Sequence, residues 1–207
     1  MNSQAFWDRQ APKYAKKPIA DQNAYEEKLQ RIRSVLRPAD RILEIGCGTG
    51  GTARNIAAVV AHVTATDLST EMIRIAQSKT GKSVTEKIVF IQAEASQEVS
   101  GYPFDAIFAF SILHLVDDIP NVLEAAYRQV KPGGYFLSKT VCLKDGSRFI
   151  QAIVRLLVLL RIAPNVAIIS RAELIRHLAR AGFKIGRTAY FGKNHRSPFI
   201  IARRPTD

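Results

Sequence analysis

The stretch Arg41–Ala57, RILEIGCGTGGTARNIA, places a short apolar run directly before a cluster of four glycines. The run Arg41–Ile45 is predicted to be a buried strand, and the residues that follow the glycines have a helical pattern. Glycine lacks a Cβ atom, so a glycine-rich turn lets the backbone approach a ligand or another segment closely. The stretch therefore predicts a strand, a tight binding loop and a helix.

The rest of the chain alternates short β-rich runs with helical patterns, which is typical of an α/β domain with a mostly parallel sheet. Ser69 and Ser170 are expected to cap helices, Gly182 to end one, and KPGG (Lys131–Gly134) to form a turn. The expected strands are Arg41–Ile45, His62–Asp67, Lys87–Ala93, Phe104–Phe110, Tyr135–Cys142 and a closing pair, Phe183–Phe191 and Ser197–Arg204. The expected helices are Ala24–Arg37, Gly51–Val60, Thr70–Lys79, Pro120–Val130 and Arg171–Phe183.

The charge of the chain is distributed unevenly. The 207 residues, enough for one domain with a sizeable core, carry a net charge of +12. Residues 1–127 hold 14 Lys and Arg against 15 Asp and Glu, whereas residues 128–207 hold 16 against 3. This asymmetry indicates either a polyanionic partner, such as nucleic acid or an anionic membrane surface, or a solvated basic face without a partner.

Other classes of protein are disfavoured by simple features of the sequence. No apolar run reaches 18 residues, and the N-terminus lacks the apolar region of a secretory signal. The two cysteines, Cys47 and Cys142, make neither a disulfide framework nor a metal-ligand pattern, so no metal site is expected. We expect a cytoplasmic protein, with a peripheral membrane location as an alternative.

Two acidic residues indicate what the glycine loop binds. Gly46, Gly48 and Gly51 satisfy the G-x-G-x-x-G pattern of dinucleotide sites, but that match alone is weak. Glu44, two residues before Gly46, would repel a pyrophosphate and would suit a cationic ligand. Asp67, which ends the second strand, can accept both hydroxyls of a ribose and fits NAD and an adenosyl group equally. The loop therefore favours a cationic adenosyl ligand over a nicotinamide dinucleotide.

Five motifs in order resemble those of class I S-adenosylmethionine-dependent methyltransferases. They are ILEIGCGTGG, TATDLSTEMI, FIQAEASQ, FDAIFAFSILHLVDD and VKPGGYFLS, and they cover about residues 40–140. The opening FWDRQAPKYAKK also resembles the N-terminal lid of small-molecule members. The resemblance implies a Rossmann-like, seven-stranded, mostly parallel sheet with helices on both faces and an antiparallel last strand. The implied divisions of the single domain are a lid and helix (1–37), a cofactor-binding core (38–141), a cap insert (142–170) and a C-terminal helix and strand pair (171–207).

The resemblance also implies a cofactor site for S-adenosylmethionine. The glycine loop would lie against the methionine part, Asp67 would accept from the ribose hydroxyls, and Glu94 would bond the adenine amine. Tyr14 would close over the sulfonium, where an aromatic face favours a cation. Met72 has an alternative reading as plain helix core. The implied cofactor-binding residues are Tyr14, Glu44, Gly46, Cys47, Gly48, Gly50, Asp67, Leu68, Met72, Glu94, Ala95, Phe110 and Ser111.

Methyl transfer from a sulfonium is a direct displacement that depends on positioning. A neutral amine acceptor needs no base, whereas a phenol or hydroxyl acceptor does. His114, just past the fourth strand, is the candidate base, with Tyr14 as the second catalytic candidate; the alternative for His114 is a structural role under the lid. His62 and His177 are expected to be structural, and His195 to lie at the surface.

The acceptor is indicated only by the last third of the chain. The apolar stretch Phe149–Ile169, interrupted by arginines, predicts a cap helix over the acceptor pocket, with a membrane contact or a dimer contact as further readings. A hydrophobic small molecule or lipid-like acceptor is the first hypothesis. An RNA methyltransferase, with nucleic acid on the basic third, and a non-catalytic protein of this fold are the alternatives. The oligomeric state is left open.

Overall fold

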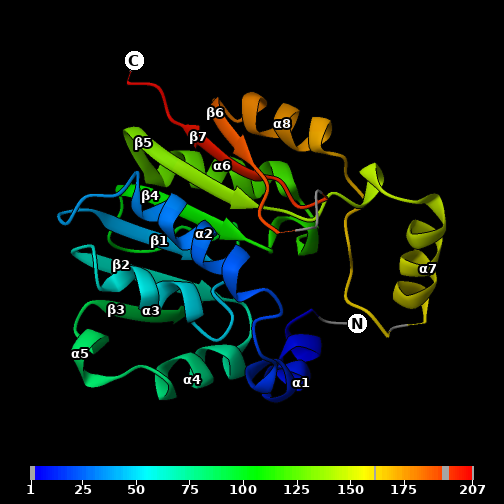
Figure 1. Ribbon diagram of the computed structural model, residues 1–207, viewed down its shortest axis with the longest axis horizontal. Helices are drawn as coiled ribbons and strands as arrows, with labels where there is room; N and C mark the ends of the chain where they lie inside the picture. Colours follow the sequence, from blue (N-terminus) through cyan, green and yellow to red (C-terminus); the bar gives the residue numbers. More distant parts are fainter. Residues whose placement is uncertain (1–2, 161, 193–195, 207) are drawn as a thin grey trace.

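Seven strands form one twisted sheet in the order β3-β2-β1-β4-β5-β7-β6 (Figure 1). The computed structural model describes residues 3–160, 162–192 and 196–206, without the side chains of residues 82 and 83. The antiparallel pairings of β7 with β5 and with β6 leave β7 as the only reversed strand within the described residues, so the expected fold class is confirmed. The strands are β1 Arg41–Ile45, β2 His62–Asp67, β3 Ile88–Gln92, β4 Phe104–Phe110, β5 Val130–Lys139, β6 Lys184–Ala189 and β7 Phe199–Arg203.

Helices cover both faces of the sheet, and each face has its own apolar core. Leu29 and Ile56, from the helices on one side, join the first core with Phe108 and Phe199 of the sheet. Leu123 and Leu174 join the second core on the opposite face. The α-helices are α1 Ser3–Lys16, α2 Gln22–Arg33, α3 Gly51–Ala57, α4 Thr70–Ser78, α5 Lys82–Thr85, α6 Ile119–Gln129, α7 Arg148–Leu159 and α8 Arg171–Arg180.

The parallel strands bring their carboxyl ends to one side of the sheet, which we call the carboxyl edge. The register pairs Phe110 at the end of β4 with Lys139 at the end of β5, and Asp67 at the end of β2 with Gln92 of β3. Figure 1 shows α1 and α7 at this same side of the molecule. In open α/β sheets, ligands bind outside the carboxyl ends of the strands. The fold thus places a candidate site at the carboxyl edge.

Local capping signals in the sequence are confirmed. The Ser69 hydroxyl accepts a hydrogen bond from the Met72 N–H at 3.1 Å at the start of α4. Ser170 and Glu173 form a capping box at the start of α8. Gly182 follows the end of α8 with φ +97°, the left-handed conformation that glycine adopts without strain.

Three expected helices end at least three residues earlier than the sequence pattern suggested, and one of them is α8, which ends at Arg180 rather than at Phe183. The helix predicted as Ala24–Arg37 is α2, which begins at Gln22, directly after the capping Asp21, and ends at Arg33. The Ser34 hydroxyl donates to the Arg31 carbonyl at 2.8 Å, and this bond competes with continuation of the helix. The helix predicted to reach Val60 ends at Ala57 as α3. After α2 and α3 the apolar pattern continues into a turn that is still packed on the sheet.

The predicted KPGG turn proved to lie inside a strand. Strand β5 starts at Val130, so Lys131–Gly134 forms a bulge in it, and the register against β4 shifts between Phe104 and Ala106. Gly133 has φ +75°, and a Cβ atom at Gly134 would lie 2.8 Å from the Asp105 carbonyl oxygen. The bulge therefore requires glycine at both positions. The strand ends at Lys139, earlier than the predicted Cys142.

Candidate functional site

The loop between β1 and α3, residues 46–50, is held in a conformation that glycine provides. Gly46, Gly48 and Gly50 have φ values of +67°, +54° and +72°. A Cβ atom at Gly46 would lie 2.7 Å from the Ile112 side chain. At Gly48 the nearest atom would be in the Tyr14 ring, 3.7 Å away. We call residues 46–50 the glycine loop. Its backbone is in close contact with Ile112 at Gly46 and has more free space at Gly48.

Asp67 links the glycine loop to the end of β2. Its Oδ2 accepts a hydrogen bond from the Gly48 N–H at 2.8 Å, and its Oδ1 accepts one from the Ser69 N–H at 2.9 Å. Burial raises the pKa of Asp67, and the two backbone hydrogen bonds lower it. A carboxylate has about four acceptor sites on two oxygens. Asp67 can therefore hold the loop and still accept further hydrogen bonds from a ligand.

Glu44 is a buried acid at the end of β1. The residue is 3 % exposed, and its Oε2 atom has no hydrogen-bond partner among the residues that the structure describes. Burial raises the pKa of Glu44 above that of an ordinary glutamate, while the neighbouring Lys28 ammonium lowers it. A buried oxygen without a partner is costly unless a ligand supplies one. The unsatisfied oxygen fits a cationic or hydrogen-bond-donating ligand at the glycine loop.

Lys28 of α2 is a functional candidate that the sequence reasoning missed. Its side chain is 7 % exposed, and its Nζ donates to the Thr52 hydroxyl of α3 at 3.2 Å. The ammonium lies 4.6 Å from the centroid of the Tyr25 ring and 4.7 Å from that of Phe110. Burial lowers the pKa of Lys28, and Glu44 raises it. The site therefore contains a buried cation beside a buried acid, and the only sequence signal was a lysine on the apolar side of an amphipathic helix.

The N-terminal helix α1 lies against α4 beside the glycine loop. Asp8 accepts hydrogen bonds from the Ser69 hydroxyl at 2.6 Å and from the Glu71 N–H at 3.1 Å. Burial raises the pKa of the Tyr14 hydroxyl, with smaller contributions from Asp67 and Glu44. Tyr14 is 51 % exposed, so its ring stands beside Gly48 without closing off the site. The role of α1 as a lid stays a prediction.

Leu68 and Met72, which both follow Asp67 in the sequence, have different surroundings. Leu68 is half-buried, and its carbonyl oxygen accepts a hydrogen bond from the Gln92 side chain at 3.3 Å. Met72 is 3 % exposed and packs with Ala11 of α1 in a small core between α1 and α4. This contact matches the helix-core reading of Met72 and gives it the task of holding α1.

The residues expected at the adenine end lie just after β3. Glu94 is exposed, and its carbonyl oxygen accepts a hydrogen bond from the Gln97 N–H at 3.0 Å. Ala95 is half-buried against the core. Because β3 lies beside β2 and their register pairs Asp67 with Gln92, these residues follow the strand next to the ribose candidate. Cys47, within the glycine loop, is buried, and its N–H donates to the Thr66 carbonyl at 2.8 Å.

The end of β4 forms the other side of the site. Phe110 is half-buried over Lys28, and Ser111 has φ +59°, a left-handed conformation that is unusual for a residue other than glycine. The Ser111 N–H donates to the Lys139 carbonyl at 2.7 Å, which fixes this turn. Strained backbone conformations persist where the surroundings hold them and cluster at functional sites.

His114 follows in the short 3-10 helix Leu113–Leu115. Its Nδ1 is buried and has no hydrogen-bond partner within the described part of the chain. Burial lowers the pKa of His114 to about 4, so the imidazole is neutral near pH 7 and can accept a proton. The His114 carbonyl accepts a hydrogen bond from the Ala167 N–H at 2.8 Å, which joins this turn to the segment after α7.

Of the other histidines, the two that the structure describes are not brought to this group. His62 begins β2, at the opposite end of the strand from Asp67, and His177 lies within α8. His195 lies outside the described residues. No cluster of three or more His, Cys, Asp or Glu with metal-binding geometry occurs in residues 3–160, 162–192 and 196–206.

Taken together, these residues form a cradle that suits a positively charged adenosyl ligand. The glycine loop gives access to backbone, Glu44 offers a free carboxylate oxygen, and Asp67 has acceptor capacity to spare. The Asp67 carboxylate beside the loop would oppose a phosphate-bearing ligand by charge repulsion, whereas burial and the neighbouring Lys28 moderate the charge of Glu44. The cradle therefore fits the ligand class that the sequence predicted.

Comparisons with known proteins give the same result. Residues 18–187 match the sequence model of the family described as Methyltransferase domain. The chain is 28% identical over 189 residues to the ubiquinone biosynthesis O-methyltransferase of Xanthomonas axonopodis pv. citri, covering 87% of this chain and 76% of that protein. It is 30% identical over 188 residues to the protein of the same name from Xylella fastidiosa strain 9a5c, covering 87% and 74%.

A solved structure shares the fold over the whole length. The N-methyltransferase NodS of Bradyrhizobium japonicum WM9, solved in complex with S-adenosyl-L-homocysteine, superposes with a TM-score of 0.73. The superposition covers 99% of this chain and 100% of NodS at 16% sequence identity. At that identity the likeness is one of fold.

Proposed function

This chain belongs to the class I S-adenosylmethionine-dependent methyltransferases, and we propose that it methylates an oxygen atom of a hydrophobic small molecule or lipid-like acceptor. It is an enzyme whose cofactor is S-adenosylmethionine. The observation that carries the assignment of the site is the buried Glu44 carboxylate, which has an unpartnered oxygen beside the glycine loop.

The cofactor supplies the methyl group when it is bound, as a substituent of a positively charged sulfur. In our proposal Glu44 attracts the cationic end of the cofactor, and Asp67 accepts hydrogen bonds from the ribose hydroxyls. Tyr14 of α1 stands beside the glycine loop and offers its ring face to positive charge. Glu94 and Ala95 bind the adenine ring. Leu68, Phe110 and Ser111 complete the walls.

We assign the acceptor to the part of the carboxyl edge near the end of β4, away from the adenine candidates that follow β3. Phe110 stacks on Phe199 with ring centroids 6.0 Å apart, and Phe191 lies 5.2 Å from Phe199. The segment after α7 is hydrogen-bonded to His114, and its Ala167 and Ile169 pack on the core of the other face of the sheet. Ligand pockets are mostly apolar with a few placed polar groups. These neighbours support a hydrophobic acceptor.

Methylation of oxygen is favoured over methylation of nitrogen by two observations. The curated relatives are named O-methyltransferases. His114 has an Nδ1 without a partner among the described residues; burial keeps the imidazole neutral near pH 7 but also lowers its basicity, so the proposed role as a general base rests on the unpartnered nitrogen. In the proposed reaction His114 accepts the hydroxyl proton while the oxygen attacks the methyl carbon. An amine acceptor would not need this base.

A parallel transfer assay tests the proposed acceptor. Radiolabelled S-adenosylmethionine is supplied with the enzyme and, separately, with a phenolic metabolite pool, a lipid extract and an RNA pool. The proposal expects label in an organic-extractable phenolic or lipid product. Label confined to RNA would support the alternative function. Binding of S-adenosylmethionine without transfer in any pool would support a non-catalytic binding protein.

A further inference from the structure

Helix α7 is an apolar helix that the other described residues leave largely uncovered. In Arg148–Leu159, all of which the structure describes, no residue is buried. Figure 1 shows α7 standing apart from the sheet and from the helices that cover it. A helix that is apolar around most of its circumference is normally buried. Something outside the chain is therefore needed to cover α7.

Several large apolar side chains of this segment are exposed. Phe149 is 73% exposed, Leu156 53% and Leu159 78%. Phe149, Ile153 and Leu156 follow one another at the helical spacing of four and three residues, so they share a face of α7. The half-buried residues of α7, which form its inner side, are Ile150, Gln151, Val154, Leu157 and Val158. The outward side of α7 thus carries large apolar side chains although its inner side is apolar as well, whereas the outward face of an ordinary surface helix is polar.

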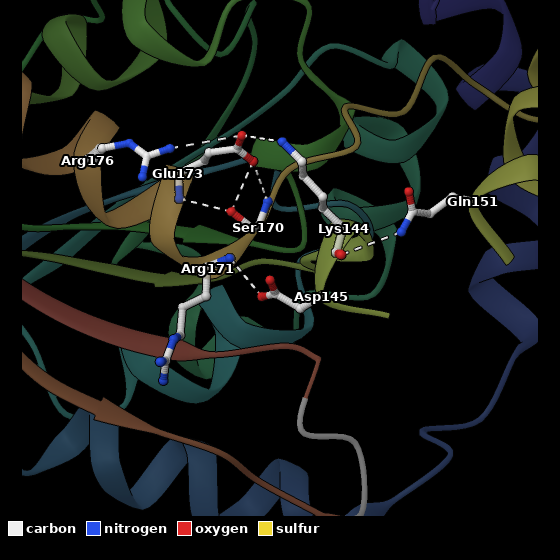
Figure 2. A network of polar contacts seen from close by, with 7 residues as sticks. All are labelled: Lys144, Asp145, Gln151, Ser170, Arg171, Glu173 and Arg176. Atoms are coloured by element: carbon white, nitrogen blue, oxygen red, sulfur yellow. Dashed lines mark hydrogen bonds and ion pairs between the residues drawn. The ribbon is translucent and has the colours of Figure 1, made fainter. Parts of the chain in front are cut away.

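A polar network fixes the base of α7 and leaves its outward face exposed. Figure 2 shows Lys144 paired with Glu173 of α8, and the Asp145 carboxylate accepting a hydrogen bond from the Arg171 N–H at 2.7 Å. Gln151 of α7 donates to the Lys144 and Gly146 carbonyls at 3.5 and 3.3 Å. The helix is therefore held at its root in a defined place beside the carboxyl edge.

The charge of the segment selects among possible partners. From Gly146 to Ala172 the chain has four arginines and no acidic residue. Arg148 and Arg155 belong to α7 itself. Two such surfaces would repel each other, so a second copy of the chain is disfavoured, whereas an anionic surface is complementary. Apolar side chains between arginines on one short helix are the composition of a helix that lies in a lipid interface.

The length of α7 limits how it can meet a bilayer. Twelve residues extend about 18 Å, which is less than the hydrocarbon thickness of about 30 Å. No helix in the described residues combines the length and apolar character that crossing a bilayer requires. A helix of this kind can only lie along the surface, with its apolar side chains below the headgroups and its arginines extended toward them.

We infer that α7 docks the enzyme onto an anionic membrane surface through Phe149, Ile153, Leu156 and Leu159, with Arg148 and Arg155 contacting lipid phosphates. The segment leads from β5 and returns to His114 through the Ala167 hydrogen bond, so docking brings the carboxyl edge to the membrane. The purpose of this docking rests on the proposed hydrophobic acceptor, but the docking itself does not. Membrane binding can be measured without an acceptor, so the two proposals can fail separately.

The test is vesicle co-sedimentation of the full chain. Vesicles of phosphatidylcholine alone and of phosphatidylcholine with 30% phosphatidylglycerol are compared at low and high salt. We expect binding to the anionic vesicles, weaker binding at high salt, and little binding to the neutral ones. The double variant Phe149→Ser/Leu156→Ser should lower binding at least tenfold. Arg148→Gln and Arg155→Gln should each lower binding about fivefold, because a basic residue near an anionic surface contributes about 1 kcal/mol.

Matched controls separate docking from general effects. Val59→Ser changes an exposed apolar side chain that follows α3, and Lys184→Gln removes an exposed cation of β6. Both should retain binding, and all variants should keep the wild-type melting temperature. Unchanged binding of the Phe149/Leu156 variant would overturn the inference. It would also be overturned by retention of an RNA pool without vesicle binding, or by self-association that the same variant abolishes.

Discussion

The Gly48 N–H donates a 2.8 Å hydrogen bond to the Asp67 carboxylate, which ties the glycine loop after β1 to the end of β2. The same carboxylate accepts from the Ser69 N–H at the start of α4. One side chain thus aligns two turns at the carboxyl edge. An adenosyl ligand in the cradle would meet these turns already positioned, which reduces the ordering that binding requires.

Replacing Asp67 by alanine is expected to weaken binding of S-adenosylhomocysteine about 10- to 100-fold. Hydrogen bonds to a charged group contribute about 1.5–3 kcal/mol, and both the ribose contacts and the loop contacts would be lost. Isothermal titration calorimetry measures the change. Asp40→Ala is the matched control, because Asp40 also accepts a backbone hydrogen bond, from the Arg37 N–H at 2.8 Å, but lies before β1. Full affinity in Asp67→Ala would show that the ribose site lies elsewhere.

Gly46→Ala is expected to lower the melting temperature by at least about 4 °C. A left-handed conformation costs a non-glycine residue about 1–2 kcal/mol, and the new Cβ would also press on Ile112 at 2.7 Å. Gly81→Ala provides the comparison, since a Cβ there has nothing within 4 Å and φ is −73°. It should change the melting temperature by less than about 2 °C. Equal shifts for the two variants would mean that the glycine loop is not sterically required.

His114→Ala is expected to lower kcat about 10²- to 10⁴-fold with a hydroxyl acceptor, because a positioned base contributes that much to proton transfer. Affinity for S-adenosylhomocysteine should stay within about twofold of wild type. His177→Ala, which changes a histidine of α8, should retain activity. Single-turnover methyl transfer separates the chemical step from binding. A His114→Ala enzyme with wild-type kcat would assign the histidine a structural role.

Glu173 contributes a stabilisation that depends on pH. Hydrogen bonds from Lys144 and Ser170 lower the pKa of this carboxylate to about 2. A lowered pKa stabilises the fold above the unfolded value of about 4.3, and the stabilisation is lost as the pH falls from there toward 2. Since the side chain is 24% exposed, we expect at most about 1 kcal/mol.

Glu173→Gln should therefore lower the free energy of unfolding at pH 7, and its difference from wild type should shrink as the pH approaches 2. Urea unfolding at pH 7, 4 and 2.5 measures this difference. Glu26→Gln is the control, because Glu26 forms an exposed pair with Arg33 and caps no helix. A pH-independent difference for Glu173→Gln would contradict the account.

The sequence predicted those parts of the fold that depend on local patterns. Strands β1, β2 and β4 begin and end where the apolar runs do, because each run is bounded by a charged or turn-forming residue. The serine caps at Ser69 and Ser170 were also predicted, since capping depends on residues within one turn. The bulge Lys131–Gly134 was not, because it forms only when β4 supplies a partner strand.

Some residues of the candidate site could likewise be predicted from the sequence, and others could not. Glu44, the glycine loop and Asp67 could be located because the ends of neighbouring parallel strands meet at one edge. Lys28 was missed because its role depends on Thr52, Tyr25 and Phe110, which only the packing of α2 on the sheet brings around it. The exposure of α7 also could not be predicted from the sequence, because its apolar pattern fits a buried cap helix equally well.

The central claim is that buried acids at the glycine loop select a positively charged adenosyl ligand, and calorimetric titration of Glu44→Gln tests it most directly. Wild-type protein should bind S-adenosylmethionine in the micromolar range and should not bind NAD, and the variant should bind S-adenosylmethionine at least tenfold more weakly with its fold intact. Equal affinity in wild type and variant, or NAD bound as tightly as S-adenosylmethionine, would contradict the claim.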